Sequence, residues 1–141
     1  MSLVIYYDGI LYADTRAWGG PGVSPPGNKD KVVVADNGDL IRITSGELGM
    51  PTKVLETYNS GGKFVEAGDH QTLVLKRDGS LWYWADEAYI VGPLTSKFSA
   101  VGTGSKYALG VLAHGGTVRE AFKIASGLDY FTDATFRTFK P

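Results

Sequence analysis

The chain has 141 residues, of which 43% are hydrophobic and 21% charged, a balance typical of one globular domain with its own core. Its 14 basic and 15 acidic residues leave a net charge of −1, so no overall positive field favours nucleic acid or an anionic membrane. The absence of cysteine excludes disulfides, thiolate metal sites and a cysteine nucleophile, and no apolar run approaches membrane-spanning length. We expect a soluble, cytoplasmic protein with a single domain over residues 1–141, with neither nucleic acid nor membrane as a partner.

The chain begins with a predicted hairpin. Residues 2–7 and 10–15 alternate as two paired strands, and Asp8-Gly9 between them is a strong turn signal. Ser2 stands directly behind the initiator methionine, and Asp14 lies at the end of the returning strand.

Two registers of this hairpin are compatible with the sequence. If Asp8 and Gly9 alone form the turn, Ser2 lies opposite Thr15. If the loop is one residue longer and contains a bulge, Ser2 lies opposite Asp14. Only the second register places the side chains of Ser2 and Asp14 on one face of the sheet.

The middle of the chain alternates between turns and short elements. Prolines and glycines throughout residues 19–31 predict an exposed loop. Residues 31–34 and 40–46 predict a second hairpin, rich in β-branched side chains. Residues 51–59 predict a short helix that starts at a proline, and residues 64–68 a further short strand.

A third hairpin is predicted over residues 71–86. Its returning strand carries Trp82 and Trp84 on one face and Tyr83 on the other, because successive strand side chains alternate. One of these two faces must belong to the core.

The last third of the chain predicts a strand, two helices and a final strand. Residues 98–102 predict a buried strand, 103–116 the first helix and 135–140 the closing strand. The second helix opens with a capping-box pattern, Thr117-x-x-Glu120. Its predicted buried face consists of Ala121, Ile124, Ala125 and Leu128. Hairpins beside paired helices favour an α+β fold in which sheets are flanked by helices.

Four stretches, in this order, resemble the proteasome β subunits and the bacterial HslV peptidases. They are ILYADTR (10–16), NKDKVVV (28–34), ITSGELG (43–49) and the strand-and-helix-pair block over 98–132. The resemblance covers nearly the whole chain. It implies the four-layer αββα sandwich of the N-terminal-nucleophile hydrolases, with a helical layer after Gly49 reduced to one short helix.

The resemblance also implies a catalytic site. It identifies Ser2 as the nucleophile once Met1 is removed, although the family's usual residue there is threonine. It places the active-site lysine at Lys31, with Lys29 as the alternative, and it places the family's Gly-Ser-Gly triplet at residues 102–104. The implied catalytic residues are Ser2, Asp14, Lys31, Gly46 and Thr103.

These residue types suit amide hydrolysis on chemical grounds alone. A free α-amine has an ordinary pKa of about 8, so it can act as a base toward the hydroxyl of the same residue. A nearby lysine lowers the pKa of both groups, and a carboxylate orients that lysine. Asp14 and Lys31 fit these roles, and the N–H of Gly46 would stabilise the oxyanion.

Each residue also has a simpler interpretation. Ser2 is then only a small residue behind the start, and Lys31 an ordinary solvated charge. Asp14 forms a turn or cap, Gly46 ends a strand, and Thr103 caps the helix that follows it.

Three functional hypotheses result. The first is a peptidase that acts on unfolded peptide inside a homo-oligomeric ring, to which the resemblance adds an ATP-driven unfoldase as partner. The reduced helical layer argues against that unfoldase. The second is a catalytically inactive ring-forming scaffold or binding protein with the same fold, and the third an amidase for a small substrate.

No cofactor or metal is expected. His70 and His114 have no metal-ligand spacing, and we interpret both as surface or turn residues.

Overall fold

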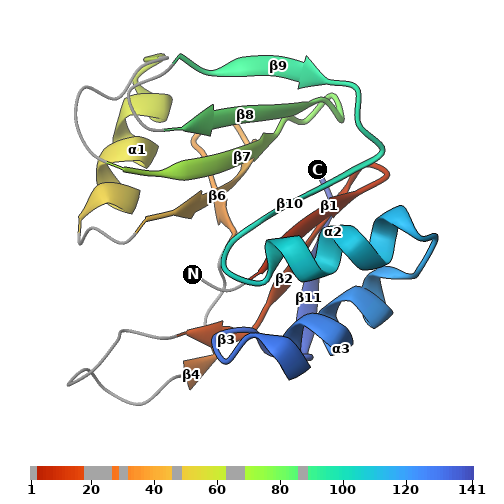
Figure 1. Ribbon diagram of the computed structural model, residues 1–141. Coiled ribbons are helices and arrows are strands. Elements are labelled where there is room, and N and C mark those ends of the chain that lie inside the picture. Colours follow the sequence, from red (N-terminus) through yellow and green to blue (C-terminus); the bar gives the residue numbers. More distant parts are fainter. Residues whose placement is uncertain (1–2, 18–26, 29–31, 46–48, 63–68, 86–88) are drawn as a thin grey trace. The chain divides into compact units, whose positions relative to one another are not determined.

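The structure is a computed structural model, and it describes residues 3–17, 27–28, 32–45, 49–62, 69–85 and 89–141. They fall into two compact units, one from residues 1–31 and 97–139 and the other from 32–96 and 140–141 (Figure 1). The single domain predicted for the chain stays a prediction, and the predicted strand 64–68 lies outside the described residues. Among the described residues, no helix is both long and apolar enough to cross a membrane.

The first unit is a four-stranded antiparallel sheet with two helices against one face (Figure 1). The sheet order is β10-β1-β2-β11, and residues 16–17 and 27–28 form a separate short pair, β3 and β4. The other elements are β1 (Val4–Tyr7), β2 (Ile10–Asp14), β10 (Phe98–Val101), α2 (Ser105–Ala113), α3 (Val118–Leu128) and β11 (Phe136–Phe139).

The β1–β2 hairpin has the shorter of the two predicted turns. Asp8 and Gly9 both have positive φ, 49° and 88°, as a two-residue turn with the twist of its strands requires. Tyr7 pairs with Ile10, and the register continues to Val4 opposite Ala13. The alternative register with a bulge, the only one expected to place the side chains of Ser2 and Asp14 on one face of the sheet, is therefore wrong.

The capping box that begins α3 is confirmed. The Thr117 hydroxyl accepts a hydrogen bond from the Glu120 N–H at 3.1 Å, and the Glu120 carboxylate accepts one from the Thr117 N–H at 3.0 Å. Two of the four N–H groups that a helix start leaves unpaired thus have acceptors.

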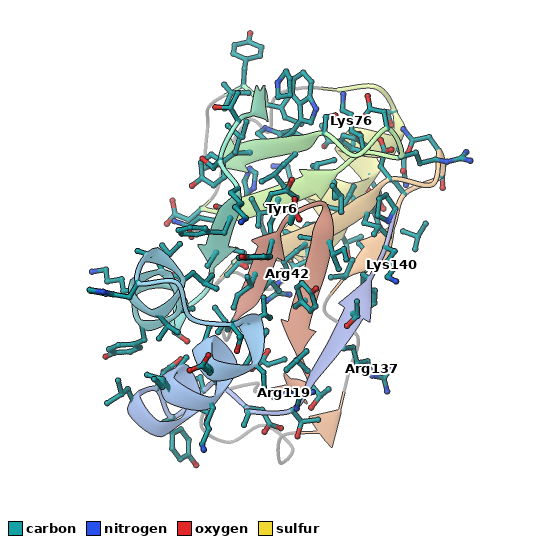
Figure 2. The ribbon with its side chains drawn as sticks, turned by 90° about the vertical axis from the view of Figure 1, so that its right-hand side faces the viewer. Tyr6, Arg42, Lys76, Arg119, Arg137 and Lys140 are labelled. Atoms are coloured by element: carbon teal, nitrogen blue, oxygen red, sulfur yellow. The ribbon has the colours of Figure 1, made fainter. Side chains whose placement is uncertain are left out.

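The buried face of α3 is only partly as predicted. Ala121 and Ala125 are buried, but Ile124 is 45% exposed and Leu128 62% exposed. The reason is Phe122, whose ring stacks on that of Phe136 in β11 at 4.6 Å and turns the buried side of the helix toward residue 122. The Cζ of Arg119, which is labelled in Figure 2, lies 5.5 Å from the centre of the Phe136 ring.

The second unit is a five-stranded antiparallel sheet with the order β5-β6-β7-β8-β9. Its elements are β5 (Val33–Val34), β6 (Leu40–Thr44), α1 (Met50–Asn59), β7 (Gln71–Leu75), β8 (Leu81–Ala85) and β9 (Val91–Leu94). Val54 of α1 belongs to one buried cluster with Ile41, Ile43 and Val74. The helix Met50–Asn59 confirms the predicted helix, and the antiparallel pairs β5–β6 and β7–β8 confirm the two predicted hairpins. Trp82 and Trp84 share this helix-covered face, as predicted.

Two features of this unit were not predicted. Strand β9 contains Gly92-Pro93, residues that normally indicate a loop. The proline is tolerated because β9 is an edge strand, where a missing N–H donor breaks no pairing on the open side. His70 is not a surface residue: it is buried, its Nδ1 lies 2.9 Å from the Thr72 hydroxyl, and its ring meets that of Trp84 edge-on.

Candidate functional site

Two of the five predicted catalytic residues fall in the part of the chain that the structure describes. Asp14 and Thr103 both belong to the first unit. Ser2, Lys31 and Gly46 lie outside the described residues, as does the alternative lysine, Lys29.

Asp14 is a buried carboxylate at the end of β2. It is 1% exposed, and its backbone N–H donates to the Leu3 carbonyl at 3.1 Å, so it belongs to the sheet and not to a turn or helix cap. Its Oδ1 accepts a long hydrogen bond of 3.5 Å from the Leu3 N–H, and its Oδ2 accepts one of 2.9 Å from the Asp133 N–H. Both carboxylate oxygens thus have backbone donors, as burial of a charged group requires.

The bond to Leu3 relates Asp14 to the chain terminus. The nitrogen of Leu3 is the amide nitrogen that joins residues 2 and 3. The Asp14 carboxylate is therefore hydrogen-bonded to the peptide group that follows the predicted nucleophile directly. This position depends on the hairpin register, which sets Leu3 beside Asp14 one step beyond the pair Val4 and Ala13.

Thr103 lies in the turn between β10 and α2 and does not cap the helix. The N-cap of α2 is Gly104, which has no side chain to cap with. The Thr103 hydroxyl instead donates to Asp129 Oδ2 at 2.6 Å, and the Thr132 hydroxyl donates to the same oxygen at 2.6 Å. A Cβ on Gly104 would lie 2.5 Å from the Thr132 hydroxyl oxygen, so glycine is required where the turn meets this network.

Asp129 is the acceptor that joins these two hydroxyls. Burial works to raise the pKa of Asp129, but the two hydroxyl bonds and a third from the Phe131 N–H outweigh it. Together they hold the pKa of this carboxyl below its usual value. The network therefore favours the ionised carboxylate.

Replacing Thr103 by valine is expected to raise the pKa of Asp129 and to weaken the fold at neutral pH. A depressed pKa contributes stability that is present above the unfolded pKa and is lost as the pH falls through the folded one. The loss should be about 1 kcal/mol at pH 7, since partial exposure screens the bond, and should shrink on acidification. Urea unfolding at several pH values measures it. The exposed Thr138→Val is the control, and a loss that does not change with pH would contradict the assignment.

Asp129, Thr132 and Asp133 were not predicted from the sequence. All three lie in the segment between α3 and β11, which reads as an ordinary polar connection. The signal that was available is its composition: aspartate and threonine at close spacing favour loops fixed by side chain to backbone hydrogen bonds. Among the described residues, no group of three histidine, aspartate or glutamate side chains could hold a metal ion.

Comparison with known proteins gives matches at the level of structure. No protein-family model and no curated protein matches the sequence. The structure of Thiobacillus denitrificans BPH is similar with a TM-score of 0.66 at 16% identity, covering 97% of this chain and 95% of that one. The same protein in complex with epoxomicin gives 0.64 at 16% identity, with the same two coverages.

Eukaryotic HslV from Trypanosoma brucei is similar over the same extent. Its crystal structure gives a TM-score of 0.65 at 14% identity, covering 97% of this chain and 96% of that one. The chain therefore has the fold of HslV and the proteasome-type β subunits. In the described residues, the two larger antiparallel sheets and the three helices match this N-terminal-nucleophile hydrolase fold, which confirms the predicted α+β class.

Proposed function

We propose that this protein is an N-terminal-nucleophile peptidase in which Ser2, after removal of Met1, attacks peptide bonds. One observation carries the proposal: the buried Asp14 carboxylate is hydrogen-bonded to the amide that joins residues 2 and 3. A buried carboxylate is costly unless it is hydrogen-bonded, and this one is bonded to the residue that precedes β1. In the observed register the proposal assigns Asp14 to the lysine and needs no contact between the Asp14 and Ser2 side chains.

The proposed reaction proceeds through an acyl-enzyme. The Ser2 hydroxyl adds to the substrate carbonyl carbon while the Ser2 α-amine takes up its proton, and the Gly46 N–H stabilises the oxyanion. Collapse of this intermediate breaks the C–N bond, and the leaving amine receives the proton from the α-ammonium. Water then adds to the carbonyl carbon of the ester while the α-amine takes up a proton from it. The C–O bond to Ser2 breaks, the α-ammonium returns its proton to the Ser2 oxygen, and the acid product leaves.

The other proposed residues adjust the protonation of the Ser2 α-amine and the Ser2 hydroxyl. Lys31, with Lys29 as the alternative, lowers the pKa of the amine and the hydroxyl, and Asp14 orients that lysine. The Thr103 hydroxyl donates its hydrogen bond to Asp129, so the lone pairs of its oxygen stay available as acceptors. An acceptor is what an α-amine needs beside it when it gains a proton.

We extend the proposal to a ring of identical subunits in the cytoplasm with unfolded peptide as substrate. The fold shared with HslV supports such a ring. We do not extend it to an ATP-driven unfoldase. The resemblance implies docking on an outer helical layer, and the described residues of the second unit supply only α1, a helix of ten residues.

The test combines intact mass with a covalent probe. Epoxomicin is bound in the similar structure of Thiobacillus denitrificans BPH, and we use it as the probe here. By the proposed mechanism, its covalent capture needs the Ser2 hydroxyl and the free α-amine that activates it. We expect the purified protein to lack Met1, to gain the mass of one epoxomicin and to hydrolyse fluorogenic peptides. A form with an N-terminal extension that blocks the α-amine is the control. It should form no epoxomicin adduct and hydrolyse no peptide.

The inactive scaffold is the opposite outcome. Protein that lacks Met1 but neither forms the adduct nor hydrolyses peptide would overturn the peptidase proposal. The hydrogen bonds of Asp14 and Asp129 would then serve the fold alone.

A further inference from the structure

We propose that Asp133 is a positioning residue that fixes the Asp14 carboxylate in its working orientation. The inference rests on the proposed function and deepens it, because it identifies the residue that orients the carboxylate of Asp14. Asp133 lies in the segment that joins α3 to β11.

The contact between the two aspartates is made by a backbone group. The Asp133 N–H donates to Asp14 Oδ2 at 2.9 Å, while the Leu3 N–H reaches Oδ1. One donor on each oxygen fixes the rotation of the carboxylate about its Cβ–Cγ bond. The shorter of the two bonds is the one from Asp133, so this donor sets the orientation more strongly.

An N–H can aim a carboxylate only if its own peptide plane is fixed, and the Asp133 side chain fixes it. Its Oδ1 accepts from the Thr135 N–H at 3.2 Å, the closed turn that aspartate makes with the residue two positions on. Its Oδ2 accepts from the Thr15 hydroxyl at 3.3 Å. The side chain thus ties the segment to the residue next to Asp14.

The backbone continues the same connection. The Thr15 N–H donates to the Thr135 carbonyl at 3.1 Å, so the segment joins the sheet immediately after Asp133. Alanine at position 133 would keep the N–H but remove both side-chain bonds that orient it. Asparagine would keep the Oδ1 acceptor and the turn. It would replace the charged Oδ2 by an NH₂ group, which can donate to the Thr15 hydroxyl oxygen instead of accepting from it.

The experiment is the kinetics of epoxomicin adduct formation in the protein without Met1. We expect Asp133→Ala to lower the first-order rate of adduct formation roughly tenfold to a hundredfold, because misaligned catalytic groups slow the reaction by such factors. The epoxomicin concentration that gives half the maximal rate should not change, since Asp133 does not touch the ligand. Asp133→Asn should restore most of the rate. Asp8→Asn, in the turn at the other end of the same hairpin, removes the same charge and is the control.

Thr15→Val provides a second variant should Asp133→Ala fail to fold. It removes the hydroxyl that binds Asp133 and leaves both aspartates in place, so a smaller loss of the same kind is expected. An unchanged rate in these variants would overturn the inference and leave the proposed function intact. The inference would also be overturned if the epoxomicin concentration for half the maximal rate rose as much as the rate of adduct formation fell. A fall in rate for Asp133→Ala that Asp133→Asn does not restore would overturn it as well. A wild-type protein that forms no adduct would overturn the proposed function, and the inference with it.

Discussion

Hydrolysis of a fluorogenic peptide should fall roughly a thousandfold or more when Ser2 is replaced by alanine, because the variant has no hydroxyl to form the acyl-enzyme. The α-amine and the fold would both remain, so the urea midpoint should match that of the wild type. Ser2→Thr should retain activity, since it keeps both the hydroxyl and the free amine. Activity assays on all three proteins, each verified by intact mass to lack Met1, provide the measurement.

The Ser2 series separates three interpretations. Equal hydrolysis by the wild type and Ser2→Ala would show that the activity belongs to another group or to a contaminant. Hydrolysis of small amides but not of peptides would favour the amidase hypothesis. Loss of activity in Ser2→Ala together with a lower urea midpoint would assign Ser2 a structural role and count against the proposal.

The sequence predicted best those features that a few neighbouring residues determine. Asp8-Gly9 favours positive φ at two successive positions, and the structure has it there. The capping box needs only Thr117 and Glu120, and it is present. Such local signals predicted most of the strands and all three helices.

Features that depend on distant contacts were predicted less well. The buried side of α3 is set by Phe122 meeting Phe136, and nothing in the helix pattern identifies that partner. The interpretation of Thr103 as a helix cap is wrong, because the acceptor of its hydroxyl lies 26 residues later in the chain. The donor that aims Asp14 lies 119 residues away in the chain. The sequence therefore names candidate site residues one at a time, whereas it does not identify the distant groups that hydrogen-bond to them.

Asp14→Asn should impair both the fold and the reaction. Both oxygens of Asp14 accept hydrogen bonds from backbone N–H groups, and an asparagine has only one acceptor oxygen. Its NH₂ group would face one of those donors, which costs about 1–3 kcal/mol at a buried position. Loss of the charge that orients the lysine should lower hydrolysis further, by roughly a hundredfold to ten-thousandfold.

The control for this variant must lose stability in the same way without affecting the site. Asp39→Asn does so, because Asp39 is buried in the second unit and accepts from Asn37, the Tyr58 hydroxyl and the Arg77 N–H. Both variants should show lower urea midpoints, but at a temperature where both are folded only Asp14→Asn should lose activity. Equal activity in the two would mean that Asp14 serves the sheet and not the reaction. A much lower hydrolytic activity of Asp14→Asn than of Asp39→Asn at matched stability would assign the Asp14 carboxylate to the chemistry. Lost hydrogen bonds in the fold could not explain such a difference, so the charge of Asp14 would have to.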